Sequence, residues 1–199
     1  MGIGKQAKIL TDKQQNLVLN HLEKSRYPLR NKVIFMLSFK AGLRAKEISG
    51  ITWSMVCNSE SEIGQEITLE NKVSKGKYSG RVVPMHKDLR ILLVELLKQR
   101  KRTEGFNLAG NIVFSERGCK ISPQAVVNFF CNLYKDIGFE GCSSHSGRRT
   151  FITNAAKNIS FVGGTLNDVK MLAGHSNLQT TSRYIEYNAE AHKRVMELI

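Results

Sequence analysis

The chain has 199 residues, a length that suits one domain with a proper hydrophobic core. Its 41% hydrophobic and 24% charged content, without any low-complexity tract, is ordinary for a soluble globular protein and argues against disorder. The 30 Lys and Arg residues outnumber the 17 Asp and Glu residues and leave a net charge of +13, which favours a polyanionic partner, nucleic acid ahead of an acidic membrane surface.

The N-terminal part of the chain has the pattern of helices. Thr11 and Gln14 have capping-box spacing, which predicts a first helix to about Lys24. Pro28 opens a second, PLRNKVIFMLSFKAG, whose apolar residues cover most of its circumference, so we expect it to be buried nearly all round. Gly42 is its expected C-terminal cap, and the tight corner there leads into the short helical run AKEIS.

Arg44 lies directly after that corner, behind a core helix, where a cation is held rigidly enough for catalysis. Arg44 and Glu47 are three residues apart, about one helical turn, so the carboxylate can steady the guanidinium from the same face. Taken alone, two such residues more often form an ordinary surface pair. The pattern therefore leaves both interpretations open.

Short runs rich in β-branched and aromatic residues begin at Ile51. ITWSMV, EITL and RVVPM predict a three-stranded antiparallel sheet. The link ENKVSKGKYSG between the second and third runs predicts a mobile basic hairpin. Residues 70–102 hold ten basic side chains against three acidic ones, a density that fits a solvated face as well as a nucleic-acid contact.

Helical patterns dominate the rest of the chain. Residues 87–102 have a core-facing apolar periodicity, and IVFS at 112–115 suggests one further short strand. Ser122 and Pro123 are the expected N-cap and first residue of the next helix, which Gly138 closes. The expected fold class is α+β, mostly α-helical with a small three-stranded antiparallel sheet.

The C-terminal part of the chain concentrates the polar chemistry. His145 and Arg148 are three apart, hence on one face of a predicted helix. A second helix, roughly Leu166 to Ala173, ends at Gly174, just before His175. A further helix, which begins after Asn177, carries Tyr184. Each residue alone is weak evidence, because a lone histidine is more often structural and a helical tyrosine is usually part of the core.

The cysteines, at positions 57, 119, 131 and 142, have no CxxC pairing. Cys142 and His145 are two ligands without a second pair, too few for a tetrahedral zinc site. No run has the apolar length of a membrane span, and the N-terminus lacks an apolar signal core. We expect a cytoplasmic protein with free thiols, no metal, no cofactor and no membrane contact.

The ordered boxes AGLRAKEI, HSGRRTF and LAGHSNLQTTSRYI resemble those of the tyrosine recombinase (phage integrase) family. That family uses them as Arg, His-x-x-Arg, Gly-His and a nucleophilic Tyr, and the resemblance extends from about Leu10 onward. It implies a catalytic-domain fold and a site-specific DNA recombinase or integrase, which cleaves and rejoins strands through a 3′-phosphotyrosine. The resemblance also implies that neither metal nor ATP takes part.

By this resemblance Arg44 is the first arginine of the phosphate clamp and Glu47 its acidic supporter. His145 and Arg148 are the central pair. Guanidinium groups match the non-bridging oxygens of a phosphorane-like state with paired hydrogen bonds. A phenol has a pKa of about 10, so the nucleophile needs a proton acceptor, for which His145 is the candidate.

The same resemblance makes His175 the second histidine, a further hydrogen-bond donor, and Tyr184 the nucleophile. Tyr187 competes with Tyr184, but the nine-residue spacing from His175 favours Tyr184. Lys75 would be the hairpin lysine that protonates the leaving sugar oxygen. The hairpin is about one residue longer than the family's common form, so Lys77 can take its place.

The expected partner is double-stranded DNA, bound by a homotetramer on paired sites and by a monomer in isolation. The residues expected to contact DNA are Lys72, Lys77, Arg81 and Arg149. Only some forty residues precede Arg44, which leaves no room for the family's usual N-terminal core-binding domain. Residues 1–199 are therefore expected to be one catalytic domain, either natural or cut from a longer protein.

Two other functions remain compatible with the sequence. A type IB-like DNA topoisomerase uses closely similar chemistry without paired sites, and a non-catalytic DNA-binding regulator can keep the same fold. The C-terminal stretch NAEAHKRVMELI is expected to be a short amphipathic helix, which either covers its own core or docks on a neighbouring subunit.

Overall fold

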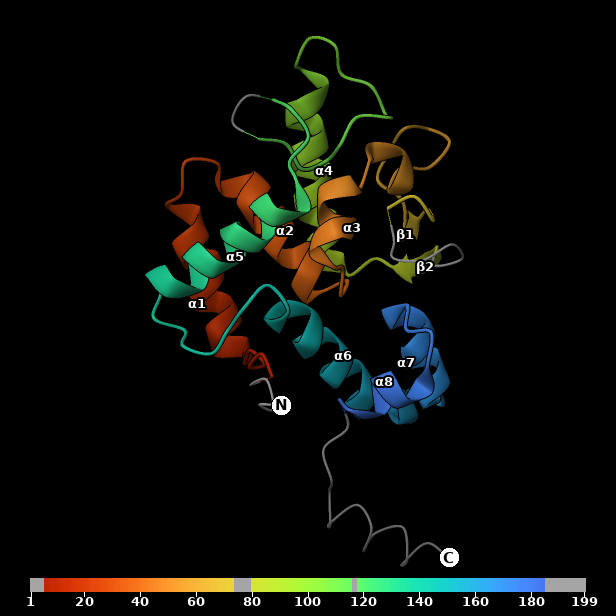
Figure 1. The fold of residues 1–199 in the computed structure, drawn as a ribbon. Coiled ribbons are helices and arrows are strands. Elements are labelled where there is room, and N and C mark those ends of the chain that lie inside the picture. Colours follow the sequence, from red (N-terminus) through yellow and green to blue (C-terminus); the bar gives the residue numbers. More distant parts are fainter. Residues whose placement is uncertain (1–5, 74–79, 116–117, 185–199) are drawn as a thin grey trace, which may run out of the picture.

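The computed structural model describes residues 6–73, 80–115 and 118–184. Most of the described elements are helices, and the last three gather on one side of the others (Figure 1). The α-helices are α1 (Asp12–Glu23), α2 (Pro28–Phe39), α3 (Ala45–Gly50), α4 (Lys87–Lys101), α5 (Pro123–Asp136), α6 (Ser146–Asn158), α7 (Leu166–Ala173) and α8 (Leu178–Ser182). The expected α+β class with mostly helical content is confirmed.

Helix α2 is the centre of the main core. Its residues from Val33 to Phe39 are all buried, as the all-round apolar pattern predicted. It packs against α4 on one side and α6 on another. The predicted capping box of α1 and the Ser122 cap of α5 are also present, so local sequence signals set these helix ends correctly.

The expected three-stranded sheet is wrong in its strand count. The described residues contain two antiparallel strands, β1 (Glu66–Leu69) and β2 (Arg81–Pro84). The first run instead forms a short 3-10 helix, η1 (Trp53–Met55), because its backbone pairs elsewhere. The Trp53 amide donates to the Gly110 carbonyl at 3.1 Å rather than to β1.

The strand expected at 112–115 is also not formed. Phe114 makes only an isolated antiparallel bridge with Lys120. Ile112 and Val113 in this segment are nevertheless fully buried. The apolar residues of this segment are therefore buried in the main core without forming part of a sheet.

A second, smaller hydrophobic cluster lies among the C-terminal helices. It is built from Ile152 of α6 with Val169 and Ala173 of α7, and Tyr184 packs against it. A 3-10 helix, η2 (Ile159–Val162), links α6 to the turn before α7. Among the described helices, none combines the length and the apolar character needed to cross a bilayer.

The corner between α2 and α3 positions the first candidate site residue. Gly42 has φ +64°, and its amide donates to the Ser38 carbonyl at 3.1 Å, which ends α2. A Cβ at Gly42 would lie 2.4 Å from Cδ1 of Phe151, so α6 packs directly on the corner. The glycine thus permits both the left-handed turn and the close approach of α6.

The substitution Gly42→Ala should therefore destabilise the fold more than a glycine substitution that strains a left-handed turn without a clash. Gly138→Ala is the matched control, since Gly138 has φ +70° but a Cβ there would meet no described atom within 4 Å beyond its chain neighbours. The control should lose about 1–2 kcal/mol from backbone strain, and Gly42→Ala clearly more. Urea unfolding of both variants measures this; equal losses would show that the Phe151 contact does not constrain the corner.

Candidate active site

Glu47 is a fully buried carboxylate in the first turn of α3. It accepts a hydrogen bond from the Arg44 backbone amide at 2.7 Å and one from Arg44 Nη1 at 3.2 Å. Its side chain is 0% exposed, whereas that of Arg44 is 25% exposed. The two residues are therefore not an ordinary surface pair, because the acid is inside the protein and the cation reaches towards solvent.

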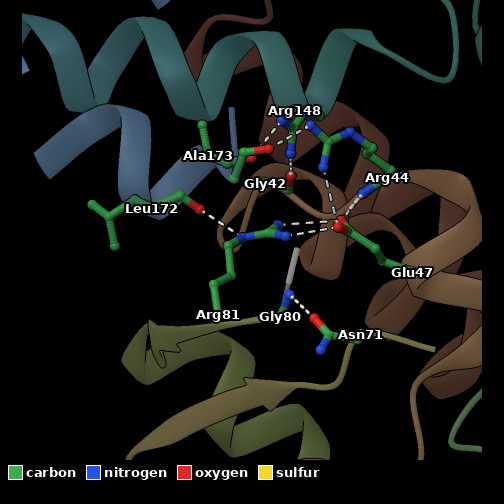
Figure 2. A network of polar contacts seen from close by, with 10 residues as sticks. Gly42, Arg44, Glu47, Asn71, Gly80, Arg81, Arg148, Leu172 and Ala173 are labelled. Carbon is green, nitrogen blue, oxygen red and sulfur yellow. Dashed lines mark hydrogen bonds and ion pairs between the residues drawn. The ribbon is translucent and has the colours of Figure 1, made fainter. Parts of the chain in front are cut away.

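A second guanidinium, from Arg81 at the start of β2, binds the same carboxylate (Figure 2). Arg81 Nη1 donates to Glu47 Oε1 at 2.7 Å and Nη2 donates to Oε2 at 3.2 Å. The Arg81 side chain is only 6% exposed. Arg81 was expected to contact DNA, but the buried negative charge of Glu47 turns it inward.

The electrostatics of Glu47 follow from these contacts. Burial raises the pKa of the Glu47 carboxyl, but the hydrogen bonds and positive charges of Arg81 and Arg44 outweigh burial and lower that pKa overall. Glu47 is therefore ionised at neutral pH. It offsets the repulsion between two arginines that lie close together.

Arg148 reaches the same region from α6. Its side chain donates from Nη1 to the Gly42 carbonyl and from Nη2 to the Ala173 carbonyl at 2.6 Å. Burial and then the neighbouring charge of Arg44 lower the pKa of Arg148 to about 9, which still leaves it cationic at neutral pH. The α2–α3 corner and the end of α7 thus hold this guanidinium between them.

The C-terminus of α7 is where all three arginines meet. Three consecutive carbonyls there, at the negative end of the helix dipole, each accept from a different guanidinium. Arg81 Nε donates to the Leu172 carbonyl at 2.9 Å, and Arg148 Nη2 donates to the Ala173 carbonyl at 2.6 Å (Figure 2). Arg44 Nη2 donates to the Gly174 carbonyl at 3.0 Å.

His175 follows directly on that helix end and is half-buried. Its Nδ1 lies 2.9 Å from the hydroxyl of the buried Thr181 in α8. Burial, and then the charges of Arg148 and the other two arginines, lower the pKa of His175 to about 4, so the ring is neutral at pH 7. When the Thr181 hydroxyl donates to Nδ1, the proton stays on Nε2, which is then a hydrogen-bond donor.

Sequence reasoning did not identify Thr181 as part of the site. The available signal was a hydroxyl residue six positions after His175, in the first turns of the predicted helix. A threonine there is common on any helix surface, so the pattern alone does not mark it. Its burial and its contact with the imidazole become visible only in the folded structure.

Tyr184 lies against His175, with the ring centroids 5.7 Å apart and the ring planes 26° from parallel. A pocket of about 360 Å³ is lined by His145, Arg148, Arg149 and Tyr184, among others. His145 is exposed at the start of α6. The structure therefore brings the proposed nucleophile, the proposed base and a clamp arginine to one pocket.

The remaining expected site residues are placed less centrally. Lys72 is exposed and pairs with Glu70 at 2.7 Å, and Arg149 Nη1 donates to the Ala7 carbonyl at 2.8 Å. Lys75, Lys77 and Tyr187, like the C-terminal segment 188–199, lie outside the described residues. Within the described ranges, no three His, Cys, Asp or Glu side chains are grouped so as to hold a metal ion.

The low pKa of His175 is directly measurable. We expect the imidazole of His175 to titrate near pH 4 in the folded chain, because burial and three arginines disfavour its protonated form. A two-dimensional NMR titration of ring nitrogen shifts measures the midpoint, and His175→Gln assigns the resonance. A midpoint near 6.5, the value of a solvated histidine, would show that the arginine cluster does not act on this ring.

Comparison with known proteins identifies the family of the chain. The model of the phage integrase family matches residues 8–191. The tyrosine recombinase XerA of Thermococcus onnurineus (strain NA1) is 30% identical over 170 residues, which cover 84% of this chain and 55% of that protein. The tyrosine recombinase XerC of Rickettsia bellii (strain OSU 85-389) is 29% identical over 184 residues, which cover 89% of this chain and 55% of that protein. The chain thus spans about half the length of these curated relatives.

Solved structures show the same fold. The Tn1549 transposon integrase in complex with a circular intermediate DNA superimposes with a TM-score of 0.75 at 19% identity, over 99% of this chain and 67% of that one. The crystal structure of XerA recombinase gives a TM-score of 0.70 at 20% identity, over 100% of this chain and 65% of that one. The fold, the ordered boxes and the family match over residues 8–191 show that the chain belongs to the phage integrase family.

Proposed function

We propose that this chain is the catalytic domain of a site-specific DNA recombinase, which cleaves and rejoins strands through a 3′-phosphotyrosine. The observation that carries the proposal is the convergence of Tyr184, His145 and Arg148 on one pocket, with His175 stacked on the tyrosine. Relatives named tyrosine recombinases XerA and XerC, and a transposon integrase solved in complex with DNA, support it.

The arginines supply the electrostatic part of the reaction. A guanidinium has five N–H donors, and the described contacts of Arg148 engage it through two backbone carbonyls, at Gly42 and Ala173. Arg148 is buried, with 4% of its surface exposed, but it lines the pocket, and its other donors are the proposed partners of the non-bridging oxygens of a phosphodiester bound there. Arg44, 25% exposed, adds the second cation, so the site is positive and preorganised before DNA arrives.

Proton transfers complete the chemistry. The Tyr184 hydroxyl attacks phosphorus and gives its proton to His145, which lines the same pocket. The bond from phosphorus to the 5′ oxygen breaks, and a hairpin lysine, Lys75 or Lys77, protonates that oxygen. Neutral His175 donates a hydrogen bond to a non-bridging oxygen. A 5′-hydroxyl from a second duplex reverses these steps and exchanges the strands.

Double-stranded DNA is the proposed partner, with a homotetramer assembled on paired sites and a monomer in its absence. Lys72, exposed beside the hairpin, and Arg149, which lines the pocket, are the proposed phosphate contacts within the described residues. Lys77 is proposed on its sequence position alone. The strongly basic chain, at +13, adds a general attraction for the DNA backbone.

The nucleophile is tested by trapping the covalent intermediate. The chain, incubated with a nicked suicide substrate of its own attachment site, should form a covalent DNA complex on a denaturing gel. Tyr184→Phe should abolish the complex, because phenylalanine has no oxygen to attack phosphorus, whereas Tyr187→Phe should retain it. A Tyr184→Phe protein that still forms the adduct would exclude Tyr184 as the nucleophile.

Two product assays separate the proposed recombinase from related functions. Recombination between two attachment sites, without relaxation of an arbitrary supercoiled plasmid, is the expected result. Relaxation without any need for paired sites would instead identify a topoisomerase. Site-specific DNA binding without a covalent complex would identify a non-catalytic regulator.

A further inference from the structure

Arg81 has a place in the site that its position in a basic stretch of sequence does not suggest. It is the first residue of β2, directly after residues 74–79 and Gly80, and pairs across the sheet with Leu69. Its Nε, Nη1 and Nη2 atoms all donate to protein oxygens, two on Glu47 and one on Leu172. With 6% of its side chain exposed, Arg81 is engaged inside the protein rather than turned to the surface.

The end of α7 is shaped around this guanidinium. Gly174 has φ +61°, and a Cβ built there would lie 2.8 Å from Arg81 Nη1 and 3.1 Å from its Cδ. No other residue would fit at position 174 while Arg81 keeps its place. Gly174 is therefore required for two reasons: it adopts the left-handed turn, and it leaves room for the Arg81 side chain packed against it.

The base of the hairpin closes at the same point. The Gly80 amide donates to Oδ1 of Asn71 at 2.7 Å (Figure 2). Arg81, the next residue, then reaches across to α3 and α7. One side chain thus joins the strand that follows the hairpin to the carboxylate that holds Arg44.

We propose that Arg81 is a positioning residue, which fixes the orientation of the Glu47 carboxylate and thereby the direction of the Arg44 guanidinium. Each Glu47 oxygen is shared between the two arginines, Oε1 by the two Nη1 atoms and Oε2 by the Arg44 amide and Arg81 Nη2. Without Arg81, Glu47 is free to turn and form a forked pair with Arg44 alone. That pair would draw Arg44 away from the Gly174 carbonyl and from a bound phosphate.

The charges around Glu47 support this role. Arg44 of α3 and Arg81 of β2 contact the carboxylate, and the charge of Arg148 of α6 also acts on it. Burial raises the pKa of Glu47, and Arg81 contributes the largest opposing effects. Loss of Arg81 should therefore raise the pKa of this carboxyl and leave Arg44 as the cation that contacts it.

A double-mutant cycle tests the proposal, which rests on the proposed strand-cleavage function. The variants are Arg81→Gln, Glu47→Gln and both together, compared in single-turnover cleavage of the nicked suicide substrate at saturating protein. Arg81→Gln should slow cleavage by on the order of 10²-fold, as expected for a displaced clamp group. In the Glu47→Gln background, Arg81→Gln should slow cleavage only a few-fold further, because Arg81 acts through Glu47.

Equal losses in both backgrounds would overturn the proposal. An Arg81→Gln protein that cleaves normally at saturation but binds DNA more weakly would also overturn it, because that result identifies a phosphate contact. Arg90→Gln is the matched control, since Arg90 is also a partly buried arginine that donates to protein oxygens, here the backbone carbonyls of Ile63 and Gly64, but contacts none of the site residues described above. It should leave cleavage unchanged.

A second measurement needs no DNA and stands even if the wild-type chain forms no covalent complex. Because Arg81 and Arg44 lower the pKa of Glu47, the ionised carboxylate stabilises the fold above its unfolded pKa, and this stabilisation is lost as the pH falls. Arg81→Gln raises the folded pKa, so its melting temperature should fall further below wild type at pH 7 than at pH 4. The melting temperature of Arg90→Gln should lie below that of wild type by the same amount at pH 7 and at pH 4.

A deficit of Arg81→Gln that does not change with pH would mean that Arg81 only packs, which would overturn the proposal. If Arg81→Gln fails to fold, Arg81→Lys replaces it in both measurements. A lysine keeps the charge but cannot bind both oxygens of Glu47 as a fork. It should therefore slow cleavage, and should shift the pH dependence less than the glutamine does.

Discussion

The ion pairs of buried Glu47 are the constraint on which the rest of the site depends. A carboxylate with no exposed surface is costly unless it is paired, and here Arg44 and Arg81 share it. The same negative charge lets cations approach one another that would otherwise repel. Glu47 therefore positions the arginines in addition to stabilising the fold at neutral pH. The arginines are already in place in the unbound chain, which is the preorganisation that the proposed electrostatic catalysis requires.

The C-terminal end of α7 extends this constraint to the histidine and the tyrosine. Its carbonyls anchor the three arginines, and His175 follows the last of them directly. Tyr184 stacks on His175 and packs on the small cluster formed by α6 and α7. Movement of α7 would therefore displace the proposed phosphate clamp and the proposed nucleophile together. The β-hairpin joins the same assembly through Arg81.

Local patterns in the sequence predicted much of this arrangement. Capping residues set the helix ends, Gly42 marked the corner before Arg44, and three ordered boxes carried the resemblance to the family. Contacts between distant segments were not predictable in the same way. Arg81 lies in a run dense with basic residues, which suggests a surface, whereas its partner Glu47 is 34 positions away. ITWSMV has strand composition, but only the fold shows that its backbone pairs with the 108–111 loop.

The most direct measurement is a structure of the chain bound to a nicked duplex of its attachment site with vanadate in place of the scissile phosphate. The expected complex has Arg44 and Arg148 each donating to non-bridging vanadate oxygens, the Tyr184 oxygen in line with the leaving 5′ oxygen, and Arg81 still bound to Glu47. A complex in which Arg81 leaves Glu47 to contact the DNA, or in which Tyr184 lies away from vanadium, would contradict the arrangement derived from the unbound chain.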